Sequence, residues 1–126
     1  MTTATALCAS LLCVCMSAAG QREATPIFAC NLKAISAADR ARYNELVKRI
    51  RSAIRDRSQV SNGYAFTLDS KSVTLPEAAE WVSMERKCCP FLTLQLSASG
   101  NQADWLLTLT GPAGVKPLLD AEFPPR

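Results

Sequence analysis

The chain has 126 residues, enough for one domain, and 48% of them are hydrophobic against 20% charged, as in folded globular proteins. Its net charge of +3 is too small to indicate a nucleic-acid partner, and it contains no histidine. The lack of histidine excludes Cys2His2 zinc sites and any Ser-His or Cys-His catalytic pair within the chain.

The first twenty residues have the pattern of a secretory signal peptide. An uncharged, largely apolar run extends from Ala4 to Ala19, which suits a signal-peptide core and is short for a membrane-spanning helix. Residues 1–20 are therefore predicted to be cleaved near residue 19 or 20, so that the mature chain is periplasmic or secreted and has no membrane span. Because no Lys or Arg precedes the run, the alternative is a start-site artefact in front of a cytoplasmic domain.

Signal cleavage would change the cysteine count from six to three. The mature chain would keep Cys30, Cys88 and Cys89. An odd number of cysteines in an oxidising compartment leaves one thiol that is free, binds a ligand or pairs with a second chain in a homodimer.

A short polar linker (residues 21–26) is predicted to precede a single domain over residues 27–126. The domain begins with an expected strand at residues 27–32. Ser36 and Asp39 form an imperfect capping box, which predicts a helix that runs to about Arg57. The apolar residues of this helix recur at helical spacing and form one buried stripe: Tyr43, Leu46, Val47, Ile50 and Ile54. Its many basic residues are interpreted as the opposite, solvated face, not as a nucleic-acid surface.

Strands and helices alternate through the rest of the domain. A turn at residues 61–63 precedes a half-buried strand at residues 64–68. Thr74 and Glu77 form a capping box for a second helix, which Pro90 ends. A hairpin around residues 99–101 and a short helix at residues 115–123 complete the chain. The order β-α-β-α-β-β-α predicts an α+β two-layer sandwich with a largely antiparallel sheet and its helices on one face.

The segment "ERKCCPF" (residues 85–91) carries two adjacent thiols in the last helical turn. The negative end of the helix dipole does not favour a thiolate there, whereas the neighbouring cations Arg86 and Lys87 are expected to lower the pKa of a thiol. Adjacent helical side chains point about 100° apart. We therefore expect one of Cys88 and Cys89 to be buried and the other to lie near the rim of the sheet.

Three functions are consistent with these thiols. Thiolates select soft ions such as Hg(II), Cu(I) and As(III), and the candidate ligands are Cys30, Cys88 and Cys89, with the carboxylate of Glu85 beside them. Alternatively, a disulfide from Cys30 to Cys88 or Cys89 stabilises an interaction domain that has no chemistry of its own. Enzymatic thiol chemistry is the third hypothesis, and the sequence leaves open whether the protein is an enzyme.

The chain also resembles small bacterial domains of unassigned function that share an early cysteine and an E-R-x-C-C-P-F segment. The corresponding segments here are "FACNL", "NGYAFTL", "ERKCCPFLTLQL" and "LTLTGPAGV". The resemblance implies a context of heavy-metal resistance, mercury in particular. It singles out the same four residues: Cys30, Glu85, Cys88 and Cys89.

Overall fold

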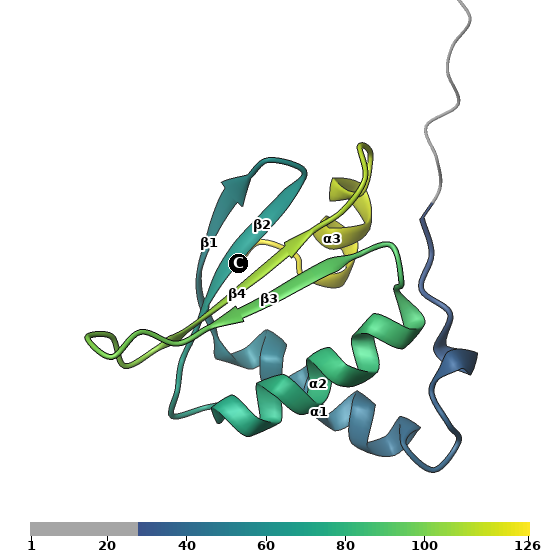
Figure 1. Cartoon of the computed structure of the whole chain (residues 1–126), viewed down its shortest axis with the longest axis horizontal. Helices are drawn as coiled ribbons and strands as arrows, with labels where there is room; N and C mark the ends of the chain where they lie inside the picture. The colour runs from purple at the N-terminus through teal and green to yellow at the C-terminus, as the bar shows by residue number, and fades with distance from the viewer. Residues whose placement is uncertain (1–27) are drawn as a thin grey trace, which may run out of the picture.

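A computed structural model describes residues 28–126 of the chain, and the predicted signal peptide and linker lie outside this range (Figure 1). The elements in order are a 3-10 turn η1 (Leu32–Ala34), α1 (Arg40–Ala53), β1 (Ile54–Val60), β2 (Gly63–Leu68), α2 (Leu75–Cys88), β3 (Thr93–Ser97), β4 (Trp105–Thr110) and α3 (Lys116–Glu122). All strand pairs are antiparallel, in the order β1-β2-β4-β3. The predicted two-layer α+β fold is confirmed. Within residues 28–126, no helix is long and apolar enough to cross a membrane.

The helices pack on one face of this sheet, and aromatic side chains join the two layers. Phe123, which follows α3, lies 5.3 Å from Phe66 of β2 and 6.0 Å from Trp81 of α2, measured between ring centroids. The register places apolar residues of β2, β3 and β4 opposite one another on this face, with Leu107 facing Phe66 on one side and Leu96 on the other. The core therefore lies between the sheet and all three helices.

Strand β2 is more buried than its alternating pattern predicts. It was expected to be half-buried, yet five of its six residues are buried and only Thr67 is partly exposed. The reason is its central place, with β1 on one side and β4 on the other. The small side chain of Ala65, on the outer face, is covered by these neighbouring strands.

The first two predicted elements differ from those in the structure. Residues 28–31 form no strand; instead the Asn31 amide donates a 2.8 Å hydrogen bond to the Cys88 carbonyl at the end of α2. Helix α1 ends at Ala53, not near Arg57, and Ile54 begins β1 in an extended conformation. The apolar stripe ends at Ile54. Pairing with β2 then supplies hydrogen-bond partners for backbone groups of the polar residues that follow.

Helix α2 has the predicted boundaries, and they position the cysteines. At its start Thr74 and Glu77 form the expected capping box. At its end Cys89 leaves the helical conformation directly before Pro90, as a proline requires of the residue that precedes it. The last turn of α2 therefore carries Glu85 and Cys88 into the core, beside the segment of residues 28–31.

Gly63 provides a test of the packing of β2 against β4. A Cβ atom at this position would lie 1.9 Å from the Leu109 carbonyl oxygen, which is backbone and cannot move aside. Gly63→Ala is expected to lower the free energy of unfolding by about 3 kcal/mol or more, measured by urea denaturation. In Gly100→Ala the new methyl group meets no atom within 4 Å, so a change within about 0.5 kcal/mol is expected. Equal effects of the two substitutions would contradict this packing.

Candidate functional site

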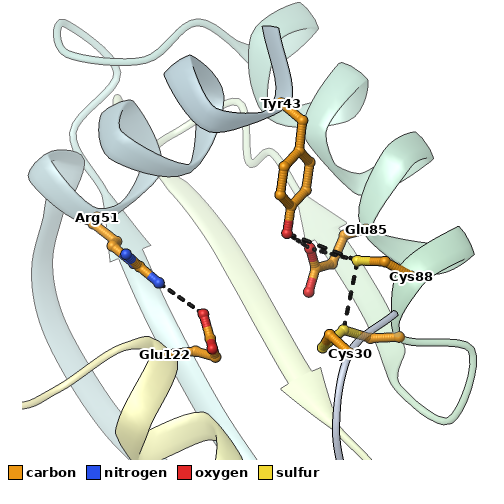
Figure 2. The surroundings of a disulfide bond; sticks show 7 residues. Cys30, Tyr43, Arg51, Glu85, Cys88 and Glu122 are labelled. Carbon is orange, nitrogen blue, oxygen red and sulfur yellow. Dashed lines mark hydrogen bonds and ion pairs between the residues drawn. A yellow bond between two sulfur atoms is a disulfide. The ribbon is translucent and has the colours of Figure 1, made fainter. Parts of the chain in front are cut away.

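The candidate site lies where the end of α2 meets the segment of residues 28–31 and helix α1 (Figure 2). Cys30 and Cys89 form a disulfide, with their Cα atoms 4.8 Å apart, and Cys88 remains a free, buried thiol. The Cys88 sulfur lies 3.7 Å from that of Cys89. The structure thus brings all three predicted cysteines together and adds Glu85 to them.

Cys88 and Cys89 are both fully buried, which corrects the expectation that one of them lies near the rim. That expectation assumed helical geometry at both residues. Cys89 instead has φ −122° and ψ 66°, so the chain turns and its side chain points back towards Cys30. The segment of residues 28–31 then covers both sulfur atoms from solvent.

A hydrogen-bond network joins α1 to the thiol. The Tyr43 hydroxyl donates to Glu85 Oε2 at 2.6 Å, and the Cys88 thiol donates to the same oxygen at 3.5 Å. Figure 2 shows the Tyr43 and Glu85 side chains pointing towards each other from the two helices. Tyr43 was predicted only as part of the apolar stripe. The sequence does contain a signal for its polar contact, because the hydroxyl group of a buried tyrosine needs a hydrogen-bond partner.

Burial dominates the electrostatics of this network. It raises the pKa of the Glu85 carboxyl, although hydrogen bonds from Tyr43 and Cys88 oppose the shift. Burial, followed by the charge of Glu85, raises the pKa of the Cys88 thiol to about 11. The pKa of Tyr43 is also raised, by burial and by its hydrogen bond to Glu85. Burial thus shifts all three groups towards their protonated forms.

The predicted influence of Arg86 and Lys87 is wrong. Both side chains are exposed on the outer side of α2, and Cys88 points into the core. Water screens such charges, so they do not offset the burial of the thiol. The pKa of Cys88 consequently moves away from thiolate formation.

A pocket of about 490 Å³ opens beside the disulfide. Its floor includes Cys30, Tyr43 and Glu85. Arg51 of α1 and Glu122 of α3 also line the pocket, and they form a 2.7 Å ion pair. A larger hollow of about 660 Å³, between β1 and the C-terminal residues, contains no cysteine and shares Arg51 alone with this pocket. Of these two pockets in residues 28–126, the one beside Cys30 therefore leads from solvent to the site.

The possible ligand atoms of the site lie close enough together to contact one ion. The three sulfur atoms and a Glu85 carboxylate oxygen all lie within 4.8 Å of one another. With the disulfide intact, Cys30 and Cys89 are bonded to each other, so an ion would meet one thiol and one carboxyl group. With the disulfide reduced, the same atoms would present three thiols to one ion.

The chain matches no family model, no curated protein and no solved structure.

The raised pKa of Glu85 predicts a specific pH dependence of stability. The folded protein holds this proton more tightly than the unfolded chain does, so the free energy of unfolding should fall as pH rises from about 4.3 through the folded pKa. Glu85→Gln cannot titrate and should remove that part of the decline, measured by urea denaturation from about pH 4 to 8.

Glu80→Gln is the matched control on the same helix. A hydrogen bond from Arg42 lowers the pKa of Glu80, so its contribution to stability has the opposite sign and is lost as pH falls. A difference between Glu85→Gln and the unsubstituted protein that stays constant over this pH range would contradict the burial of an ionisable Glu85.

Proposed function

We propose that the protein binds a thiophilic metal or metalloid ion through Cys30, Cys88 and Cys89 once the disulfide is reduced. One observation carries this proposal: three sulfur atoms from two chain segments, with the Glu85 carboxyl, lie within 4.8 Å of one another in the core. Soft ions prefer thiolate ligands, and the absence of histidine leaves sulfur as the only soft donor at the site.

The charge of the site favours an ion whose thiolate complex is neutral. Three thiolates around As(III), or two around Hg(II), sum to zero, whereas Cu(I) leaves a net negative charge. Burying a net charge is costly unless a partner compensates it. Arg51, the guanidinium that lines the pocket, is already paired with Glu122, Lys48 is exposed to solvent, and the Glu85 carboxyl is itself held towards its neutral form. As(III) in three-coordinate and Hg(II) in two-coordinate form therefore suit the site better than Cu(I).

Two further considerations support an exported protein with a role in heavy-metal resistance. A disulfide persists in oxidising compartments and is rare in the cytosol, in agreement with the predicted signal peptide. The segment "ERKCCPF", which contains two of the three cysteines and Glu85, is the part of the chain that most resembles bacterial domains from mercury-resistance contexts.

The disulfide supports a second candidate function, that of a stapled interaction domain. Cys30 and Cys89 are 59 residues apart, and their bond ties the N-terminal segment of the domain to the end of α2. A cross-link over such a loop stabilises a folded protein by about 2–5 kcal/mol. In this alternative Cys88 is only a small apolar core residue.

A titration of the reduced protein with arsenite and with Hg(II) tests ion binding. The full chain is used with Cys8, Cys13 and Cys15 replaced by serine, so that only the three site cysteines remain. We expect one ion per chain, with sulfur-to-metal absorption bands. Cys88→Ser should weaken As(III) binding by more than about 100-fold, since even the loss of residues behind the ligands costs roughly 10–100-fold. Equal affinity with and without Cys88 would contradict the proposal.

The stapled-domain alternative makes a different prediction. Under oxidising conditions Cys30→Ser should lower the free energy of unfolding by about 2–5 kcal/mol, measured by urea denaturation. Cys88→Ser keeps the disulfide and should cost less, because a serine hydroxyl can still donate to Glu85. If Cys30→Ser has this effect and the reduced protein binds neither ion, the stapled domain is the better account.

A further inference from the structure

We propose that the pocket beside Cys30 admits a small thiol, which opens the disulfide by attacking the Cys30 sulfur and releases Cys89. This inference goes beyond ion binding, because it assigns the two sulfurs of the disulfide different chemical roles. It also names the reductant by class, as a small soluble thiol rather than a protein. It holds whether or not the reduced site then binds an ion.

The two sulfurs differ in their access to solvent. Cys30 is partly exposed and lines the pocket. Cys88 and Cys89 are fully buried, and neither lines the pocket. Thiol–disulfide exchange needs an approach to the sulfur under attack, so access alone directs an incoming thiol to Cys30.

The pocket has the size and lining for a small molecule. Its volume of about 490 Å³ lies within the range of small-ligand sites, roughly 300–1,000 Å³. Its walls are partly apolar, from Phe28, Leu32, Val47 and Leu118, and Lys48 adds a positive charge. A small thiol can therefore bind there with its sulfur directed to Cys30, whereas the thiol of a folded protein would have to enter a recess between α1 and α3.

The exchange balances in two steps. The incoming thiol loses its proton to solvent, and its thiolate forms a bond to the Cys30 sulfur; the Cys30–Cys89 bond breaks and its electron pair stays on Cys89. Cys89 then takes a proton from water. A second thiolate attacks the small-thiol sulfur of the mixed disulfide, Cys30 leaves and is protonated, and two small thiols have become one small disulfide.

Cys88 has a positioning role in the first step. While the disulfide is intact, Cys88 is the one site cysteine that carries an S–H group, and its sulfur lies 3.7 Å from that of Cys89. That S–H can turn from Glu85 to the negative charge that develops on Cys89. A hydrogen bond to a charged group stabilises it more than one to a neutral group, so Cys88 should speed the release of Cys89.

The first experiment maps the mixed disulfide. The oxidised full chain is treated briefly with 2-mercaptoethanol and quenched with acid, free thiols are blocked, and the peptides are identified by mass. We expect the adduct on the peptide that contains Cys30. An adduct on Cys89, or an equal division between Cys30 and Cys89, would overturn the proposal.

The second experiment tests the route and the role of Cys88 through the rate of disulfide cleavage. Asn44→Trp places a large side chain on an exposed residue that lines the pocket and should slow cleavage roughly tenfold; Ser58→Trp, on the exposed side of β1, should not change it.

Cys88→Ala should slow cleavage roughly tenfold through loss of the hydrogen-bond donor, and Cys88→Ser, which keeps a donor, should restore most of the rate.

These outcomes are separable from those of ion binding. Ion binding is measured on protein already reduced by a phosphine, so it does not depend on the route of reduction. If the adduct forms on Cys30 but neither ion binds, the exchange chemistry stands and ion binding fails. If Asn44→Trp and Ser58→Trp react at the same rate, the pocket is not the route, whatever the reduced protein binds.

Discussion

The junction between the end of α2 and the segment of residues 28–31 organises the site. Pro90 stops the helix, and the Cys88 carbonyl, which has no partner inside the helix, accepts a hydrogen bond from Asn31. The same turn directs Cys89 to Cys30. One backbone hydrogen bond and one disulfide thus hold the segment over the last turn of α2, and this cover is what buries the sulfur atoms.

Burial then determines the chemistry of the groups under this cover. Glu85, Cys88 and Tyr43 share two hydrogen bonds at one carboxylate oxygen, and no cation is paired with Glu85 within the part of the chain that the structure describes. Such a set is most stable when it is neutral, with its protons retained. A thiophilic cation that displaces these protons would restore neutrality with its own charge. The same burial that disfavours a Cys88 thiolate is therefore compatible with the proposed binding of a soft ion.

Much of the fold follows from local sequence signals, and the exceptions have a common physical origin. The capping box at Thr74, the stop at Pro90 and the turn before Gly63 each depend on a few neighbouring residues, and each was predicted. The strand expected at residues 27–32 is not formed at residues 28–31, because the Asn31 amide donates its hydrogen bond to a helix end 57 residues away, at Cys88. The end of α1 was placed too late because pairing of Ile54 with Leu68 competes with helix continuation. Contacts distant in sequence leave no local pattern.

The candidate site likewise combines features that the sequence predicts with features that it does not. The four residues Cys30, Glu85, Cys88 and Cys89 could be named because thiols are chemically conspicuous and Glu85 lies at helical spacing from Cys88 and Cys89. Their pairing could not, since the sequence left open whether Cys88 or Cys89 bonds to Cys30, and the answer depends on the non-helical conformation of Cys89. The apolar periodicity correctly predicts that the ring of Tyr43 lies in the core. It gives no information about the hydrogen bond that the Tyr43 hydroxyl donates to Glu85.

The stapled domain and the proposed ion site would be two states of one set of sulfur atoms. Cys30 and Cys89 cannot bond to each other and both bind an ion, so oxidation would close the proposed ion site and form the cross-link, and reduction would open the site and remove the cross-link. Bound ion would itself join Cys30 to Cys88 and Cys89 and thus tie the same two segments together. Ligand binding stabilises the folded state according to its concentration relative to its dissociation constant. An ion at a concentration well above that constant would therefore replace the disulfide as the link between the segment of residues 28–31 and α2.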